Sequence, residues 1–236
     1  VARTASRIMV SFDASRQHYP DPEKVLLTGT PVREEFLYAK RQQARQALGL
    51  GDEPLIVSCW GSLGAREMNK KIAQFMKLEC EQDCWRHIHA TGSFGWRWMP
   101  DYVREQGVDL AAQPRIEMRE YIYDMPQVLA AADLIICRAG AATIAEVCAS
   151  GTPCIMVPSP NVTGNHQEKN ARVLERSGAA AVVREADCDG KSLYETAKSI
   201  LSDAGRMRAM RASARDMAVV DAAERIYQTA LDLAKH

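Results

Sequence analysis

The stretch ADLIICRAGAATIAE, residues 132–146, passes from an apolar run through a glycine turn into a helical pattern. Its apolar run, Leu134 to Cys137, is short and rich in isoleucine, as expected of a buried β-strand. The helical pattern that follows Gly140 carries two polar side chains, Thr143 and Glu146. A strand that leads through a short turn into a helix is the repeating unit of an α/β protein.

Similar β-rich runs alternate with helical patterns through most of the chain. They comprise Ile8 to Phe12, Leu55 to Cys59, Arg86 to His89, Cys154 to Val157 and Ala180 to Val183. Strands separated by helices pair in parallel, so the sequence predicts an α/β fold with a Rossmann-like, doubly wound parallel sheet. The segment after Cys59 has the 3.6-residue period of a helix that covers the sheet, with one apolar face formed by Ala65, Met68, Ile72, Phe75 and Met76.

The carboxyl-terminal part of the chain has a continuously helical pattern. Between Arg206 and Met217, Met207, Met210, Ala214 and Met217 form an apolar face. Arg208, Arg211 and Arg215 share the opposite face, which predicts a core side and a solvated side. Beyond Asp221 another apolar stripe follows, formed by Ala223, Ile226, Tyr227, Ala230, Leu231 and Ala234. We expect a partner surface to cover this stripe, because apolar patches of this kind are seldom left in water.

The composition is that of an ordinary globular protein, with 47% hydrophobic and 25% charged residues. The 30 basic residues balance 30 acidic ones, so no overall field attracts nucleic acid or an anionic membrane, and we expect no nucleic-acid partner. The chain has 7 cysteines, an odd number, and they are scattered among apolar runs. This usage indicates a reducing compartment rather than a disulfide framework, and we expect the cytoplasm. The chain starts at Val1 and no apolar stretch is long enough to cross a bilayer; we expect a piece of a longer protein.

Two turns at the ends of predicted strands have the composition of phosphate-binding loops. Gly61 and Gly64 flank Ser62, and Gly140 precedes the helical pattern that contains Glu146. Glycine lets the backbone approach a phosphate closely, and a helix N-terminus offers N–H groups with partial positive charge. The first turn alone is equally compatible with a structural role. For Glu146 we favour a carboxylate that accepts two hydrogen bonds from a ribose diol over a capping role near the helix start.

A loop rich in proline, asparagine and glycine runs from Pro158 into a helix that begins at about Asn165. Gln167 and Asn170 share a face of that helix and offer amide groups suited to sugar hydroxyls. Exposed polar residues are also common in the first turns of helices, so this segment alone does not establish a site. We expect His166 to form a local hydrogen bond rather than to act as a catalytic base.

Two patterns that resemble metal sites are better explained in other ways. The first is the group Cys80, Cys84, His87 and His89. Its spacing fits no usual zinc pattern and would join a helix end to the interior of a strand. The second is Asp187-Cys188-Asp189, which has the D-x-D form of metal-dependent sugar transferases. It stands where a loop introduces a helix, so we expect both carboxylates to cap that helix, and we expect no metal site.

Taken in order, the motifs of this chain resemble those of the MurG family of glycosyltransferases over essentially its whole length. The matching segments are Gly29 to Arg33 (GTPVR), Gly61 to Ala65 (GSLGA), His89 to Gly92 (HATG), Tyr121 to Met125 (YIYDM), Ala132 to Glu146, and Asn165 to Ala171 (NHQEKNA). The long middle segment is the most specific of these. Thr30 stands where the family has Asn, and Trp60 stands where it has Gly.

The resemblance implies the two-lobed GT-B fold, in which this chain supplies the lobe that holds UDP-N-acetylglucosamine without a metal or another cofactor. It implies that Glu146 holds the ribose hydroxyls and that the main chain at Ile122 reads the uracil. The residues that would face the diphosphate are Arg33, Ser62, Gly140, Ala141, Ala142 and Thr143. Gln167 and Asn170 would contact the sugar.

The resemblance also implies a division of the chain. Residues 1–28 would be a remnant of the amino-terminal acceptor lobe, residues 29–219 the UDP-sugar-binding Rossmann-like domain, and residues 220–236 a helix that crosses back to the other lobe. The base and the surface for the lipid-linked muramoyl-pentapeptide acceptor would belong to the amino-terminal lobe, whose G-G-T-G-G-H loop has no counterpart here. We therefore expect the donor-binding domain of the inverting glycosyltransferase that converts lipid I to lipid II, inactive on its own.

The full-length enzyme would work in the cytoplasm, in peripheral contact with the inner face of the cell membrane. Two other interpretations stay open. The chain could be the donor-binding part of another GT-B enzyme, such as a diacylglycerol glycosyltransferase or a UDP-N-acetylglucosamine 2-epimerase. It could also be a non-catalytic subunit that supplies a donor site to a separate acceptor-binding protein.

Overall fold

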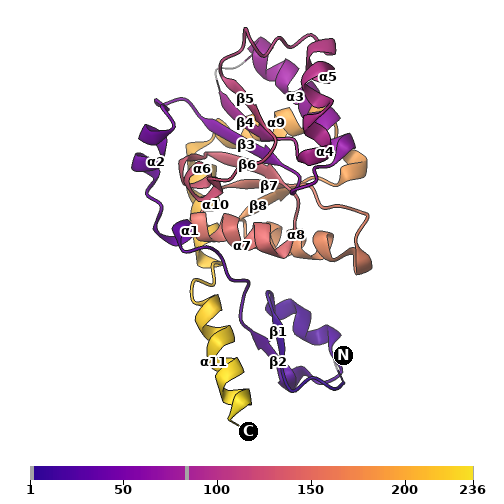
Figure 1. Cartoon of the computed structure of the whole chain (residues 1–236), viewed down its shortest axis with the longest axis vertical. Coiled ribbons are helices and arrows are strands. Elements are labelled where there is room, and N and C mark those ends of the chain that lie inside the picture. Colours follow the sequence, from indigo (N-terminus) through magenta and orange to yellow (C-terminus); the bar gives the residue numbers. More distant parts are fainter. Residues whose placement is uncertain (1–2, 83–84, 236) are drawn as a thin grey trace.

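The computed structural model describes residues 3–82 and 85–235, and its main body is a parallel sheet of six strands. The strands lie in the order β5-β4-β3-β6-β7-β8, all parallel to their neighbours (Figure 1). Their bounds are β3 (Leu55–Cys59), β4 (Arg86–Ala90), β5 (Ile116–Arg119), β6 (Leu134–Cys137), β7 (Cys154–Met156) and β8 (Ala180–Val182). The chain builds outward from β3 to β5 and then returns to β6 on the other side of β3, which confirms the doubly wound fold.

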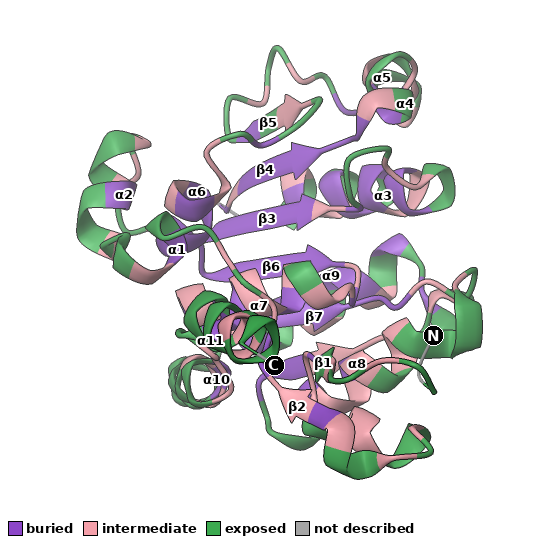
Figure 2. Ribbon diagram, turned by 60° about the horizontal axis from the view of Figure 1, so that its bottom comes forward, coloured by how far each residue is buried: buried purple, intermediate pink, exposed green. Residues whose placement is uncertain are grey.

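Helices cover both faces of this sheet, and Figure 2 shows the strands buried between them. One face carries α1 (Glu35–Tyr38), α2 (Arg41–Ala47), α6 (Met125–Ala131), α7 (Ala141–Ser150) and α8 (His166–Arg176). The other carries α3 (Arg66–Gln82), α5 (Met99–Glu105) and α9 (Gly190–Leu201), with the short α4 (Ser93–Trp96) beside α3. Helix α10 (Ala204–Asp216) packs on both α7 and α9.

The apolar face expected after Cys59 is the buried face of α3. Met68, Ile72, Phe75 and Met76 are all 0% exposed there. Ala65 stands just before the helix and is half-buried. The 3.6-residue period thus identified the side of α3 that covers the sheet.

The first strand does not join the main sheet. It is β1 (Ile8–Val10), shorter than the expected run to Phe12, and it pairs in parallel only with β2 (Val25–Leu27). The two strands are connected through the 3₁₀ helices η1 (Asp13–His18) and η2 (Pro22–Lys24). This small unit projects from the main body on the same side as α11 (Ala222–Ala234) (Figure 1).

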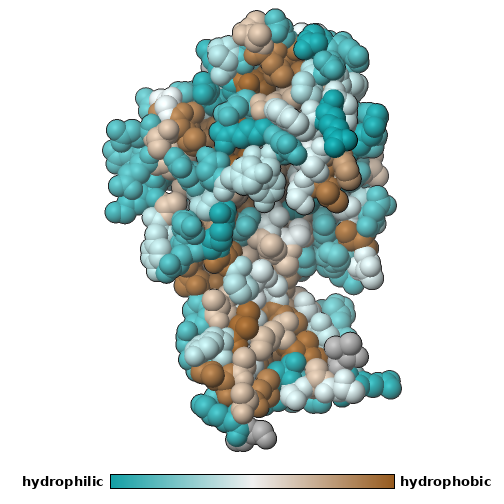
Figure 3. All heavy atoms as spheres, viewed as in Figure 1, coloured by the Kyte–Doolittle hydropathy of each residue, from teal (hydrophilic) through white to brown (hydrophobic). Residues whose placement is uncertain are grey.

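The apolar stripe of α11 is largely exposed in this structure, and its burial against a partner surface stays a prediction. Arg225 of α11 donates a hydrogen bond to the carbonyl oxygen of Leu27 at 3.3 Å, but Tyr227 is 56% exposed and only Ala222 is buried among the helix residues described. Figure 3 shows hydrophobic side chains gathered where α11 runs beside the β1–β2 unit. Among the residues described, the hydrogen bond from Arg225 to Leu27 therefore joins the two elements along a surface that is still apolar.

The arginine face of α10 is not uniformly solvated, so that expectation was wrong at Arg211. Its guanidinium donates to the carbonyl oxygen of Ala132 at 2.9 Å and to the carboxylate of Asp133 at 3.3 Å. Arg41 and Arg45 of α2 bind the same carboxylate, at 2.6 and 3.1 Å. Burial lowers the pKa of Arg211 to about 10. The buried Asp133 thus ties α2 and α10 to the turn before β6.

Among the residues that the structure describes, no helix has both the length and the apolar character needed to cross a bilayer.

Candidate functional site

A cavity of about 280 Å³ opens at the carboxyl ends of β3 and β6. The strand order reverses between these two strands, which is where open α/β sheets bind their ligands. The cavity brings together six of the expected site residues from four separate segments: Ser62, Ile122, Gly140, Thr143, Glu146 and Gln167. Parallel pairing explains this convergence, because the loop that follows each strand begins at the same end of the sheet.

The loop between β3 and α3 is held in place by two glycines that nearly touch. Gly64 has φ +79°, and a Cβ atom placed on it would lie 2.1 Å from the carbonyl oxygen of Thr91. Gly92 has φ +75°, and its Cβ would meet the backbone nitrogen of Gly64. The N–H of Ser93 also donates to the carbonyl oxygen of Ser62 at 3.0 Å. The motifs GSLGA and HATG are therefore two halves of one backbone contact, which sets the position of Ser62 at the cavity.

The start of α7 presents backbone N–H groups to the cavity region. Gly140 is the N-cap residue, with φ −71° and ψ 148°, and it has no side chain to bond the N–H groups of Ala141, Ala142 and Thr143. The first pairing inside the helix is from the N–H of Ile144 to the carbonyl of Gly140. The preceding N–H groups carry the partial positive charge of the helix end and suit a phosphate.

Glu146 is the central acidic group of the cavity. It lies more than one turn inside α7, too far from Gly140 to cap the helix. Its carboxylate is half-buried, and no donor among the described residues forms a hydrogen bond with it. Burial raises the pKa of Glu146, and the positive charge of Arg33 opposes this rise. A half-buried acceptor with no donor among the described residues is suited to bind the hydroxyl groups of a ligand.

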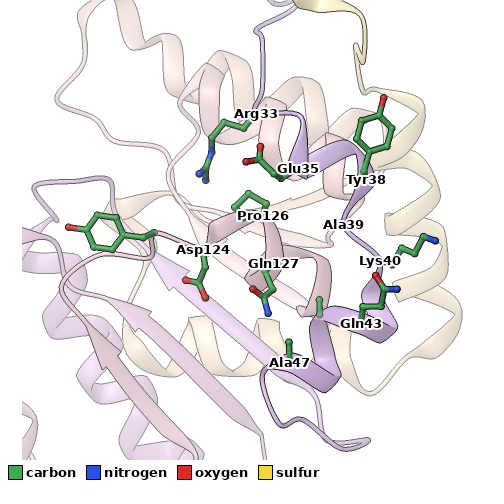
Figure 4. A pocket seen from close by; sticks show the side chains of 12 residues that line it. Arg33, Glu35, Tyr38, Ala39, Lys40, Gln43, Ala47, Asp124, Pro126 and Gln127 are labelled. Atoms are coloured by element: carbon green, nitrogen blue, oxygen red, sulfur yellow. The ribbon is translucent and has the colours of Figure 1, made fainter.

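Arg33 lies beside this cavity rather than in its wall. It lines a neighbouring cavity of about 580 Å³ between α1, α2 and α6, where Figure 4 shows it near Glu35 and Pro126. Its guanidinium stands 5.4 Å from the ring of Phe36, and its side chain is exposed. The positive charge of Arg33 nevertheless acts on Glu146 of the first cavity, where it opposes the rise in the pKa that burial causes.

The two amides of α8 have different surroundings. The side-chain oxygen of Gln167 accepts a hydrogen bond from the N–H of Ser159 at 2.9 Å, and Gln167 lines the 280 Å³ cavity. Asn170 instead donates to the carbonyl oxygen of Ala139 at 3.2 Å and lines a third cavity, of about 660 Å³. Gln167 thus faces the cavity that contains Glu146, while Asn170 supports the loop before α7. His166 bonds the carbonyl oxygen of Thr163 at 3.1 Å, as expected of a local role.

Two residues of the cavity wall received no role from the sequence. Trp60 is 4% exposed, and the guanidinium carbon of Arg138 lies 5.6 Å from its ring centroid. Arg138 also donates to the carbonyl oxygen of Val157 at 3.1 Å and pairs with Glu185 at 2.5 Å. These contacts tie together the loops that follow β3, β6, β7 and β8. The sequence did offer one signal for Arg138, because a charged residue directly after a buried strand indicates a position at the ligand-binding end of the sheet.

The residues that superficially resembled metal ligands have other partners. His87 bonds Glu79 at 2.8 Å, and Ser58 bridges His87 and His89 at 2.8 and 2.6 Å, all inside the core. Burial, followed by the neighbouring His87, holds the pKa of His89 well below its ordinary value. Cys84 lies outside the described residues. Within those described, no three His, Cys, Asp or Glu side chains are grouped as metal ligands would be.

The D-x-D carboxylates also differ from each other. Asp189 caps α9 through the N–H of Ser192 at 2.7 Å, as expected. Asp187 does not cap the helix; its carboxylate pairs with Arg184 at 2.6 Å. The reason is its position inside the 3₁₀ helix η4 (Glu185–Asp187), which places Arg184 three residues before it.

Comparison with known proteins defines the family. The sequence model described as Glycosyltransferase family 28 C-terminal domain matches residues 55–226. The chain belongs to this family. Two relatives carry the name UDP-N-acetylglucosamine--N-acetylmuramyl-(pentapeptide) pyrophosphoryl-undecaprenol N-acetylglucosamine transferase. The one from Acetivibrio thermocellus is 37% identical over 100% of this chain and 63% of its own length. The one from Caldanaerobacter subterraneus is 39% identical over 94% of this chain and 60% of its own length.

Solved structures agree on the fold. MurG from Acinetobacter baumannii superposes with a TM-score of 0.71 at 24% identity, over 97% of this chain and 60% of that one. A putative UDP-N-acetylglucosamine 2-epimerase from Listeria monocytogenes gives 0.65 at 15% identity, over 96% and 59%. The family match and the relatives confirm the resemblance to the MurG family. The chain spans about three fifths of the length of these relatives.

Proposed function

We propose that the 280 Å³ cavity binds UDP-N-acetylglucosamine and that the chain is the donor-binding part of an N-acetylglucosaminyltransferase. The observation that carries this proposal is Glu146, a half-buried carboxylate that no donor in the described part of the chain bonds, placed beside the open N-terminus of α7. Ribose hydroxyls and a diphosphate, side by side, have the chemistry that these two features complement. The names of the 37% and 39% identical relatives support the choice of sugar.

The geometry suggests how the donor would lie. Glu146 would accept the ribose hydroxyls, and the backbone at the buried Ile122 would read the base. The N–H groups at 141–143 and the loop at Ser62 would face the diphosphate, and the amide of Gln167 would face the sugar. For Asn170 the contact with Ala139 supports an indirect role, through the loop before α7.

The same groups would favour release of UDP during transfer. Negative charge grows on the diphosphate as the bond to the sugar breaks, and N–H groups fixed at a helix end stabilise that charge without having to reorganise. Arg33, whose charge reaches Glu146, would add to this field. These groups supply positive charge from the protein itself.

For the whole enzyme we propose transfer to a lipid-linked muramoyl-pentapeptide, with a base and a lipid-holding surface outside this chain. Residues 1–28 and 220–236 would belong with that second lobe. The β1–β2 unit and α11, which project together from the main body, are consistent with this division. We further propose that the enzyme acts in the cytoplasm at the inner face of the cell membrane.

Calorimetric titration of the chain with UDP-N-acetylglucosamine, UDP-glucose and UDP tests the proposal. We expect UDP-N-acetylglucosamine to bind most tightly of the three ligands. We also expect it to raise the melting temperature of the chain, because a ligand bound only by the folded state stabilises that state by mass action. If millimolar UDP-N-acetylglucosamine gives neither heat nor a thermal shift, the cavity is not a preformed donor site.

A further inference from the structure

The third cavity, of about 660 Å³, lies between the β1–β2 unit and α8. Figures 1 and 2 both place this unit next to α8. One wall consists of residues around η1, including His18 and Tyr19, and the other is formed by α8 from Asn165 to Arg176. Gln167, at the start of α8, faces the neighbouring 280 Å³ cavity. The two cavities are thus separated by the first turn of one helix.

The α8 wall of this third cavity carries surplus positive charge. Lys169, Arg172 and Arg176 all line it from one face of the helix. Arg172 is engaged by Glu168 at 3.4 Å and by Glu175 at 2.7 Å. Lys169 and Arg176 are exposed and form no ion pair with any residue that the structure describes. Because Glu168 is the only carboxylate among the lining residues described, two cations are left over for a ligand.

We propose that this cavity binds the anionic peptide of the acceptor. The inference rests on the proposed function and adds an acceptor contact to the donor lobe itself. Lys169 and Arg176 are seven residues apart on a helix, or about 10 Å along its axis. A pyrophosphate group would fill only a small part of a cavity of about 660 Å³. An extended pentapeptide spans roughly 16 Å and ends in a carboxylate, so it can lie along this face of α8.

The position of this cavity also fits the direction of transfer. An acceptor hydroxyl approaches the donor sugar from the side opposite the departing diphosphate. The diphosphate would lie at the N-terminus of α7, and the sugar at Gln167, so the acceptor arrives over the first turn of α8. A peptide attached to that acceptor then lies along the face of α8 that carries Lys169 and Arg176, with Tyr19 on the opposite wall.

The test uses the whole 236-residue chain and the double substitution Lys169→Glu with Arg176→Glu. Its ligand is soluble N-acetylmuramoyl-pentapeptide, compared with the same molecule with its carboxylates amidated and with inorganic pyrophosphate. The matched control is Lys77→Glu with Arg208→Glu, which makes the same charge change at exposed positions outside the three cavities. Calorimetry with UDP-N-acetylglucosamine shows whether each variant is folded and retains its donor site.

We expect the double substitution to weaken binding of the muramoyl-pentapeptide about tenfold, the scale for two partly screened ion pairs. It should abolish the preference for the acidic over the amidated peptide, while the control variant keeps both the affinity and the preference. UDP-N-acetylglucosamine should bind all three proteins alike. Unchanged peptide affinity in the Lys169/Arg176 variant, no peptide binding by the unaltered chain, or a loss confined to pyrophosphate would overturn the inference. Failure of UDP-N-acetylglucosamine to bind the unaltered chain would instead refute the proposed function.

Discussion

The contact between Gly64 and Thr91 offers a sharp test of how the β3–α3 loop is positioned. In Gly64→Ala the new Cβ would lie 2.1 Å from the carbonyl oxygen of Thr91 and 3.3 Å from Cα of Gly92. Carbon and oxygen without a covalent bond stay about 3.3 Å apart, so the two loops must separate by roughly 1 Å. Both neighbours are backbone atoms, which cannot rotate away as a side chain can. The loop that carries Ser62 therefore has to move.

The expected cost has two parts. A residue other than glycine in the left-handed region loses about 1 kcal/mol. Forcing atoms into a packed backbone contact adds about 1–3 kcal/mol. Gly61→Ala isolates the first part, because Gly61 also has a positive φ, +82°, but has no neighbouring atom within 4 Å of its Cβ position. Gly64→Ala should therefore destabilise the chain by about 1–3 kcal/mol more than Gly61→Ala does.

Guanidinium denaturation of both variants measures this difference. For a chain of this size, each 1 kcal/mol corresponds to about 2–4 °C in melting temperature, which provides a second reading. We also expect Gly64→Ala to weaken UDP binding, because Ser62 moves away from the diphosphate. Equal losses of stability in the two variants would show that the close approach of the two loops does not hold this part of the site.

Three further outcomes follow from the site and its support. Affinity for UDP-N-acetylglucosamine should fall as the pH is lowered through the raised pKa of Glu146, because only the ionised carboxylate accepts hydrogen bonds from both ribose hydroxyls. Titration calorimetry from pH 7 downward measures this fall, and Glu146→Ala should show a flat profile over the same range. Gln167→Ala should weaken UDP-N-acetylglucosamine more than UDP, and equal calorimetric losses would remove Gln167 from the sugar site. Asp133→Ala should cost about 3–5 kcal/mol in denaturant unfolding, since it leaves three arginines without their carboxylate; a loss below 1 kcal/mol would mean that the cluster contributes little.

Much of the fold could be predicted because the pattern that defines it is local. The strands of the main sheet have apolar runs, and α3 has a regular apolar period, so both were visible in the sequence. Strand β5 was missed because Ile116–Arg119 lies at the sheet edge and is only partly buried, which leaves a mixed sequence without an apolar run. The role of Arg211 was missed for another reason. Helical periodicity reports the direction of Cα–Cβ bonds, while a long arginine reaches across to Asp133.

The site was predicted less completely than the fold. Parallel topology brings the loops together at the carboxyl ends of the strands. The convergence of six of the expected residues could therefore be predicted without knowing the distances between them. Arg33 and Asn170 lie beside the cavity because their exact placement depends on how the linker and α8 pack, which no local pattern encodes. Trp60 could not be assigned a role, since its stacking on Arg138 joins two loops that are distant in the sequence.

The most direct test of the account is the affinity of UDP for the unaltered chain and for Glu146→Ala, measured by calorimetry at neutral pH. If Glu146 holds the ribose hydroxyls, its removal should weaken UDP binding by roughly 1–3 kcal/mol, the range for hydrogen bonds to a charged group. Gln167→Ala serves as the comparison, because a residue that contacts only the sugar should leave UDP binding nearly unchanged. UDP binding of equal strength in the unaltered chain and in Glu146→Ala would contradict the assignment of this cavity as the donor site.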